Sequence, residues 1–374
     1  MSAEYSLAKS KKYSAVKARI FAADIVITVL SLGVFQFFLS RPVFRAAFAI
    51  HSNFYVACLI FSGIFLLFMY VTGFPLHLAG SFFVERRFKL SRQNFGAWTA
   101  DEAKSAVLSF ALSIICIQVF YLVLRNFPAA WWIISAAAWI FFSVVLTRFL
   151  PVFLIPIFFK YAPIADRPLR ERIMALAERA GIRLMDVCQI DFSRKTAKAN
   201  AALVGLGKTR KVILADTLTQ GFAPEEVEAV VAHEFGHFKH KHIWQLLAFS
   251  GITTITGFFV LFLAAEKIAA LTGAAGISDL YLLPALVFLM AVFGFILLPL
   301  QNFFSRVLER QADGFALDLT GAPEEFISMM EKLAATNLAD MEPSRLQKVF
   351  LYNHPPIADR IRMARDFRNK DGGN

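Results

Sequence analysis

Long apolar runs alternate with shorter polar stretches over most of this chain, and the pattern predicts a bundle of membrane-spanning helices. Each run has about twenty residues, which is the length that a helix needs to cross the hydrocarbon core of a bilayer. The runs cover residues 20–39, 54–79, 106–124, 130–149, 243–264 and 280–300. The first run and its polar leader are both too long for a signal peptide, so we expect an uncleaved span. Pro151 and Pro156, just after the fourth run, are expected to bend or end its helix.

The polar block at residues 160–242 predicts a folded domain outside the bilayer. Its first helix is expected to begin at Asp166-Arg167-Pro168 and its last at Pro224-Glu225-Glu226, because proline suits the first helical turn and acidic residues suit the positive end of the helix dipole. Strands are expected between these helices, at residues 182–190, 201–205 and 212–215. The remainder, residues 301–374, is charged and is predicted to be mostly helical.

The composition agrees with a membrane protein, since 57% of the 374 residues are hydrophobic and only 18% are charged. A net charge of +11 can indicate a nucleic-acid partner, but no basic patch with interleaved aromatic residues is present. The 41 phenylalanines fall largely in uncharged runs, so the lipid bilayer is the expected partner, with no nucleic acid. The three cysteines form no CxxC pair, so neither a disulfide framework nor a thiolate metal site is indicated.

The distribution of positive charge predicts the side of the membrane that the polar domain occupies. Residues 1–19 and the loop 81–104 lie on one side of the predicted bundle and carry five lysines and arginines each, ten in all. The loops on the other side, residues 41–53, 125–129 and 265–279, carry two, one and one, or four in all. Because positively charged loops stay in the cytoplasm, the N-terminus is expected there. Four spans precede the polar domain, so it is expected to be cytoplasmic too.

The segment His233-Glu234-Phe235-Gly236-His237, in the last predicted helix of the polar domain, has the HExxH pattern of a metalloprotease. Residues i and i+4 share one face of a helix, so His233 and His237 can direct ring nitrogens to one metal ion. Glu234 lies beside them, where it can take a proton from a water molecule on the metal. A catalytic zinc site also needs a third protein ligand and one open position.

Two further histidines are poor candidates for the third ligand. His240 shares the helical face of His237, but it lies seven residues from His233, about 10.5 Å along a straight helix. One straight helix cannot wrap three such positions around a tetrahedral ion. His242 is expected to face elsewhere.

Glu309 is the better candidate for the third ligand. Two predicted spans separate it from His237, so it returns to the same side of the membrane. Asp313 lies one helical turn further on and can accept the ring N–H of a ligating histidine, a common way of orienting metal ligands. A solvated helix with alternating charges beside Arg306 and Arg310 accounts for the same spacing equally well.

Three separated motifs resemble those of the type I CAAX prenyl endopeptidase family, the membrane zinc proteases that include the a-factor-converting enzyme. The segment 233–242, HEFGHFKHKH, is similar to the family's HELGHWKxGH. Residues 305–313 match SRxxExQAD, and His354-Pro355-Pro356 with Arg360 matches HPP followed by an arginine. The polar loop at residues 85–96 also has a counterpart. The resemblance covers nearly all of the chain from about residue 70 onward.

The resemblance implies a metal centre and a base. His233, His237 and Glu309 would hold one zinc ion, and Glu234 would activate water. Asp313 would orient a ligating histidine.

The resemblance also implies groups that act on the substrate. His354 and Arg360 would stabilise the oxyanion of the tetrahedral intermediate. Without the family match, a histidine before two prolines is only a residue of a rigid loop, and Arg360 is a surface charge. The pair Asn200-Ala201, which has a counterpart in the family, would lie on the strand edge that pairs with the substrate backbone.

The expected fold is mainly α, a polytopic membrane protein of about six transmembrane helices with a cytoplasmic α+β, gluzincin-like zinc protease domain. We expect residues 1–160 to form an N-terminal membrane domain with four spans and residues 161–242 the protease core. Residues 243–304 would add two spans, and residues 305–374 would complete the protease domain with the third zinc ligand and the HPP motif. Eukaryotic members of the family have seven helices around an intramembrane chamber, so one N-terminal helix is expected to be missing here. Whether the remaining helices close a chamber is left undecided by the sequence. Together with a C-terminus that is no retrieval signal for the endoplasmic reticulum, this favours a bacterial inner-membrane homologue.

The predicted function is a multi-pass membrane zinc endopeptidase that cuts peptides or membrane-protein segments, small or prenylated, near the cytoplasmic face. A first alternative is a broad quality-control protease, similar to the heat-shock membrane metalloproteases that share HExxH and a downstream glutamate. A second alternative is a non-catalytic membrane scaffold with structural zinc. Glu234 argues against the scaffold, because a structural site needs no base.

Overall fold

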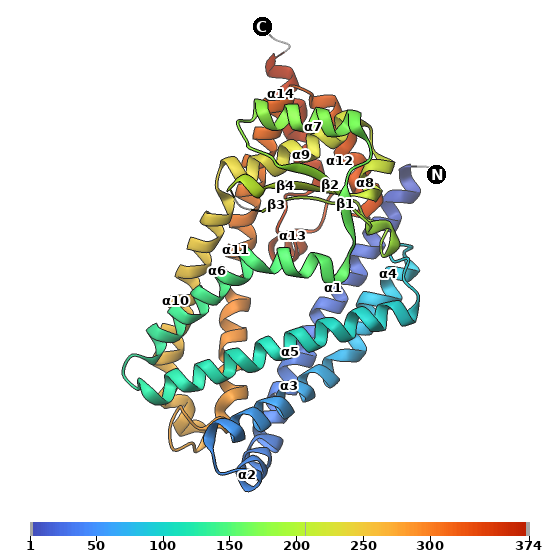
Figure 1. The fold of residues 1–374 in the computed structure, drawn as a ribbon. Helices are drawn as coiled ribbons and strands as arrows, with labels where there is room; N and C mark the ends of the chain where they lie inside the picture. Colours follow the sequence, from blue (N-terminus) through green and yellow to red (C-terminus); the bar gives the residue numbers. More distant parts are fainter. Residues whose placement is uncertain (1–2, 206, 372–374) are drawn as a thin grey trace.

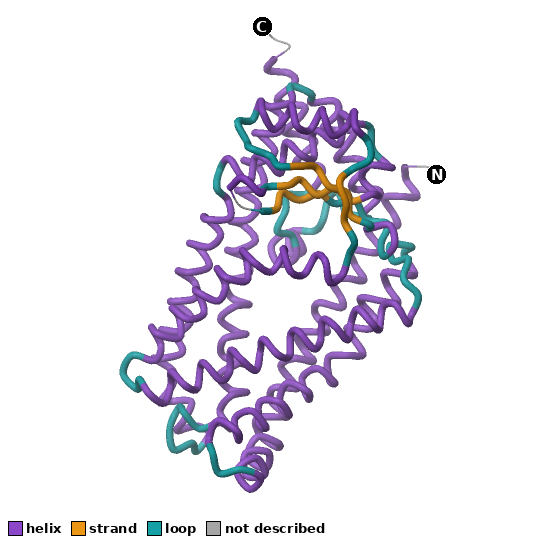
Figure 2. The backbone as a smooth tube through the Cα atoms, viewed as in Figure 1, coloured by secondary structure: helices purple, strands orange, loops and turns teal. Residues whose placement is uncertain are grey.

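The computed structural model describes residues 3–205 and 207–371, which form a long helical region and a smaller domain of helices and strands at one end of it (Figure 1). The strands are confined to the smaller domain, and the rest of the described chain is helices joined by short loops (Figure 2). The fold is therefore mainly α with one α+β domain, as predicted.

Residues 3–158 supply long helices that are joined by short turns. Polar residues mark two of their starts: the side chain of Asn53 accepts from the N–H of Tyr55 at 2.9 Å, and that of Asn94 accepts from the N–H of Ala97 at 2.8 Å. The elements are α1 Ala3–Val34, the π-helical η1 Phe35–Leu39, α2 Ser40–Ile50, α3 Phe54–Leu78, the π-helical η2 Ala79–Phe83, α4 Val84–Arg87, α5 Phe95–Asn126 and α6 Trp131–Phe158.

Five helical segments of the described chain are long and apolar enough to cross a membrane, and they contain five of the six predicted runs. The segments are Leu7–Ile50, Phe54–Arg87, Phe95–Asn126, His242–Thr272 and Leu280–Thr320. The remaining run, residues 130–149, falls in α6, where Trp131–Thr147 is a shorter apolar helix. This helix continues beyond Pro151 and Pro156 to Phe158, so neither proline ends it.

The smaller domain is built from two separate parts of the chain, before and after a pair of long helices. Before the pair come β1 Tyr161–Pro163, α7 Arg167–Arg179, β2 Asp186–Ile190, the 3-10 turn η3 Phe192–Arg194, β3 Ala201–Val204, the 3-10 turn η4 Gly207–Thr209, β4 Lys211–Ala215, α8 Asp216–Gly221 and α9 Pro224–Lys239. The pair and the elements after it are α10 His242–Thr272, the 3-10 turn η5 Leu280–Leu282, α11 Leu283–Thr320, α12 Pro323–Asn337, α13 Arg345–Leu351 and α14 Ile357–Asp371.

The sheet has four strands in the order β1-β2-β4-β3, so β3 lies at one edge. Strand β4 pairs in parallel with β2 and antiparallel with β3, while β1 runs antiparallel to β2. The sequence predicted the last three strands, although β2 begins at Asp186 rather than at residue 182. The sequence prediction missed β1, because three residues that end in Pro163 are too short for an alternating pattern and proline suits only an edge strand.

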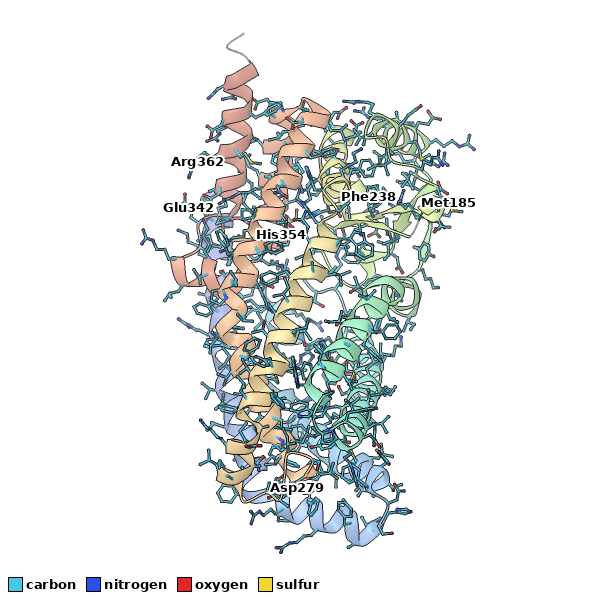
Figure 3. The ribbon with its side chains drawn as sticks, turned by 90° about the vertical axis from the view of Figure 1, so that its left-hand side faces the viewer. Met185, Phe238, Asp279, Glu342, His354 and Arg362 are labelled. Atoms are coloured by element: carbon cyan, nitrogen blue, oxygen red, sulfur yellow. The ribbon has the colours of Figure 1, made fainter. Side chains whose placement is uncertain are left out.

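Helix α11 connects the two regions of the molecule. Its 38 residues span about 57 Å at 1.5 Å per residue. Near its start Leu286 packs in the hydrophobic cluster of the long helices, and near its end Leu317 packs in that of the smaller domain. Figure 1 shows it passing from the helical region into the smaller domain beside α9. In the view with side chains, His354 lies in the upper part of the molecule and Asp279 at the opposite end of the long helices (Figure 3).

Candidate active site

The start of α9 is fixed by Glu226, as the Pro-Glu-Glu pattern predicts. Its carboxylate accepts from the backbone N–H of Ala223 at 2.7 Å, which satisfies a donor that the helix itself leaves free. The same buried carboxylate binds Lys332 Nζ at 2.7 Å and Ser328 Oγ at 2.6 Å, both on α12. The helix that carries HExxH is therefore tied to the helix behind it.

Two histidines of α9 and one carboxylate of α11 converge on one point. His233 and His237, one turn apart, have Nε2 atoms 3.1 Å from each other. Glu309 places Oε2 at 3.3 Å from Nε2 of His233 and Oε1 at 3.3 Å from Nε2 of His237. The structure thus brings together the three side chains that the sequence singled out as ligands.

This arrangement fits a metal ion. A tetrahedral ion with bonds of about 2.1 Å holds its donor atoms about 3.4 Å apart, close to the separations between these three side chains. Glu309 Oε2 is buried and accepts no hydrogen bond from the described residues, an arrangement that is costly unless a cation is bound. Two imidazoles and one carboxylate are a donor set typical of divalent transition metals.

A glycine allows α9 and α11 to approach closely enough for these donors to meet. A Cβ atom on Gly236 would lie 2.8 Å from Cα of Ala312 and 2.9 Å from its carbonyl oxygen. Backbone atoms cannot move aside as a flexible side chain can. Glycine is therefore required at this crossing, one residue before His237.

Asp313 lies against the ring of His233, the contact expected from the sequence. Its Oδ1 lies 2.8 Å from Nδ1 of His233, and the side chain is completely buried. The hydrogen bond keeps the proton on Nδ1 and leaves Nε2 free to bind a metal. Arg360 in turn donates Nε to Asp313 Oδ2 at 2.7 Å and Nη2 to Oδ1, so that its guanidinium holds the carboxylate in place.

His242 orients the other histidine, contrary to the prediction that it faces elsewhere. Its Nδ1 lies 2.9 Å from Nδ1 of His237, and its Nε2 lies 3.0 Å from Oε1 of Gln311. The prediction was wrong because it assumed one straight helix. Helix α9 ends at Lys239, and Lys241 adopts a left-handed conformation with φ of 57°, which turns the next residue back toward the site. His240 is exposed and does not join the ligand group.

A cleft of about 440 Å³ opens beside His233 and is lined by residues from both parts of the smaller domain. Glu234 and His354 both line it. The Nε2 atom of His354 lies 3.4 Å from Glu309 Oε1, and its side chain is half exposed. Arg360 lines the cleft as well, and its guanidinium also forms an ion pair with Asp313.

Burial and charge shift three titratable groups of the site. Burial raises the pKa of the Glu234 carboxyl above its usual value. Burial alone would lower the pKa of His233, but the carboxylates of Asp313 and Glu309 beside the ring raise that pKa to about 9. Burial lowers the pKa of His354. The carboxylates around His233 therefore create an environment that favours a positive charge.

The open edge of β3 forms one wall of the cleft. Asn200 and Ala201 line it, and the carbonyl of Asn200 accepts from the N–H of Ala215, so residue 200 pairs toward β4. The neighbouring odd-numbered positions then direct their backbone groups to the free edge. At Ala199 this edge is occupied by the side chain of Asn337, which accepts from the N–H at 3.0 Å and donates to the carbonyl at 3.4 Å.

Arg306 is a site residue whose position the sequence analysis did not foresee. It is 8% exposed and donates Nη1 to the carbonyls of Lys348 at 2.8 Å and Tyr352 at 2.7 Å, at the end of α13. It thereby fixes the loop that leads to His354. The alternative of a solvated helix is wrong for this face of α11, because Glu309 and Asp313 are buried too.

Two family models match the chain. Residues 163–368 match the model described as peptidase family M48, and residues 2–160 match the model described as the N-terminal domain of CAAX prenyl proteases with five membrane helices.

Curated relatives and a solved structure agree with these matches. The chain is 30% identical over 286 residues to the uncharacterised metalloprotease YhfN of Bacillus subtilis, covering 75% of this chain and 67% of that one. It is 30% identical over 310 residues to a CAAX prenyl protease 1 homologue of Arabidopsis thaliana, covering 78% and 69%. The crystal structure of S. mikatae Ste24p has the same fold, with a TM-score of 0.84 at 24% identity, over 96% of this chain and 89% of that one.

Proposed function

The chain belongs to peptidase family M48 and is a membrane metalloendopeptidase, and from that premise we propose that its metal is zinc, that Glu234 is its base, and that it cleaves peptides at the cytoplasmic face of a bacterial inner membrane. The observation that carries the proposal is the convergence of His233, His237 and Glu309 beside a cleft that Glu234 lines. In this proposal residues 1–160 and 243–304 are the membrane part, and 161–242 and 305–374 together form the protease.

The metal ligands and the base divide the chemistry between them. His233, His237 and Glu309 hold the zinc ion, and Asp313 keeps the His233 ring oriented. Bound zinc supplies Lewis acidity, which makes water a nucleophile at neutral pH. Glu234 would take a proton from the attacking water and return it to the leaving amine. Its raised pKa suits both steps, since a base works best when its pKa lies near the working pH.

His354 and Arg360 stabilise the oxyanion that forms during attack. The ring of His354 is half exposed in the cleft. Nε and Nη2 of Arg360 are used by Asp313, and its Nη1 has no hydrogen-bond partner among the described residues. Arg360 can therefore direct Nη1 at the substrate, and His354 can donate from Nε2 when its ring is protonated, because its Nδ1 lies 2.7 Å from Oδ1 of Asn353. Loss of one such donor typically costs roughly 10²–10³ in rate.

The substrate binds as an added strand along the open edge of β3. The side chain of Asn337 already pairs with Ala199 as a neighbouring strand would, so the edge is accessible from the cleft at Ala201. Main-chain pairing of this kind tolerates many side chains. It supports activity on varied peptides, and a prenyl group would add selectivity.

Replacing the base tests the mechanism. We expect Glu234→Gln to lower kcat by about 10²–10⁴-fold while zinc content stays unchanged, because the amide cannot accept the proton and the three ligands are intact. Cleavage of a fluorogenic peptide by detergent-purified protein measures this. Glu225→Gln, the same change at an exposed position of α9, is the control and should retain full activity. Full activity in Glu234→Gln would refute the mechanism.

The substrate class needs a separate comparison. A farnesylated CaaX peptide, the same peptide without the farnesyl group, and an unfolded membrane protein are offered to the purified enzyme. We expect the farnesylated peptide to have the highest kcat/KM. Preference for the unfolded membrane protein would instead identify a quality-control protease.

A further inference from the structure

The N-terminal turns of α1 lie beside the smaller domain, far in sequence from the site (Figure 1). Two consecutive residues there, Tyr13 and Ser14, are buried although their neighbours Lys12 and Ala15 are exposed. Successive side chains on a helix point about 100° apart, so two adjacent residues can reach two different surfaces.

Tyr13 is connected to the strand-edge wall of the cleft. Its hydroxyl donates to Glu85 Oε1 at 2.5 Å, and Glu85 Oε2 binds Lys198 Nζ at 2.9 Å. Lys198 immediately precedes Ala199 and β3, and its carbonyl accepts from Thr217 Oγ1 at 2.7 Å. The loop after Glu85 continues the connection, because residues 90–92 pair with residues 195–197 through backbone hydrogen bonds.

Tyr13 also supports the residue that occupies the edge of β3. Its ring packs edge-on against Phe88 with centroids 5.1 Å apart, in a small buried cluster that includes Leu338. Leu338 has φ of 51°, a left-handed conformation that is unfavourable for leucine and persists only when packing enforces it. Asn337, the residue before it, makes both hydrogen bonds to Ala199.

Ser14 is connected to the opposite wall of the cleft. Its Oγ lies 3.1 Å from the hydroxyl of Tyr352 and 3.4 Å from Nε2 of Gln347. Tyr352 lines the cleft two residues before His354, and its carbonyl is held by Arg306. One helical turn of α1 is therefore connected, through Glu85 and Lys198, to the wall that would bind the substrate strand, and it contacts the loop that would supply His354 directly.

We propose that Tyr13 and Ser14 form a clamp that sets the separation of the two cleft walls, so that α1 is a positioning element for peptide binding. The proposal rests on the proposed function of the cleft. It differs from a role in overall stability because both residues act through hydroxyl groups on chains of contacts that end at cleft-lining residues. The expected consequence is on substrate binding rather than on the metal.

Removing each hydroxyl tests the clamp. Tyr13→Phe keeps the ring packing and loses the bonds of the hydroxyl to Glu85 and, at 3.4 Å, to Lys198 Nζ. Ser14→Ala loses the bonds to Tyr352 and Gln347. We expect each to raise KM for the peptide roughly 3–10-fold, as for one lost hydrogen bond, with kcat within about twofold and zinc content unchanged. Lys12→Ala, an exposed change on the same turn, is the control and should match wild type.

Hydrogen exchange gives a readout that does not depend on turnover. We expect faster amide exchange at residues 199–204 in Tyr13→Phe and at residues 352–356 in Ser14→Ala, each relative to Lys12→Ala. If wild type cleaves peptides and neither KM nor exchange changes in the two variants, the clamp is refuted while the proposed function stands. If wild type does not cleave peptides, the proposed function fails, and hydrogen exchange still tests the clamp. Faster exchange in the two variants would support it, and unchanged exchange would refute it.

Discussion

At the scale of single residues, Lys241 shows how one backbone angle changes the surroundings of a ligand. Its positive φ breaks the helical path that follows α9 and turns the chain back toward the site. Nδ1 of His242 then lies 2.9 Å from Nδ1 of His237. Gln311 Oε1 accepts from one nitrogen of His242, so the other nitrogen accepts from Nδ1–H of His237. This leaves Nε2 of His237 free to bind the metal.

A substitution of His242 should weaken metal binding. We expect His242→Ala to lower zinc affinity by about 10–100-fold, the usual effect of losing a group that orients a ligand. Competition with a chromogenic chelator measures the affinity without any assay of activity. His51→Ala, which removes an exposed ring just after α2, should change it little. Equal affinities in the two variants would show that His242 does not orient His237.

At the scale of elements, the crossing of α9 and α11 determines whether the ligands can meet. HExxH supplies two donors on one helix, and the third arrives only because α11 passes against the backbone of α9 at Gly236. The sequence revealed both helices through their motifs and their apolar runs. It did not reveal the crossing, because the closeness of two helices depends on packing between residues that are far apart in sequence. The same limitation hid the bond from Arg306 to the end of α13.

A methyl group at the crossing should separate the helices. We expect Gly236→Ala to lower stability by about 1–3 kcal/mol through overpacking and to lower zinc content as well, because Glu309 moves away from the histidines. Thermal unfolding in detergent and metal analysis measure the two effects. Gly314→Ala is the matched control, since a Cβ atom there meets nothing within 4 Å. Unchanged zinc and stability in Gly236→Ala would contradict the packing account.

At the scale of the whole molecule, the apolar runs were the most readable feature of the sequence. Each run is long enough to define its own helix, so no tertiary information was needed to find it. Their number also predicted that Glu309 returns to the end of the bundle that carries His237, and in the structure Glu309 Oε1 lies 3.3 Å from Nε2 of His237. The boundaries of the strands were less readable, because each strand is only three to five residues long.

The proposed sidedness can be tested by labelling. In a background with Cys116→Ser, we expect Leu271→Cys, an 88% exposed position at the end of α10, to react with a membrane-impermeant maleimide on intact spheroplasts. Arg362→Cys on α14, in the smaller domain, should react only after the membrane is permeabilised. The reverse pattern would place the catalytic domain outside the cytoplasm.

The central claim is that one zinc ion joins the two distant motifs, and metal content tests it most directly. Detergent-purified wild type is compared with Glu309→Ala, and peptide cleavage is followed on the same samples. We expect one zinc ion per chain in wild type, and loss of both zinc and cleavage in the variant, because two histidines alone leave the site with too few ligands. Zinc retained and cleavage unaffected in Glu309→Ala would contradict the account.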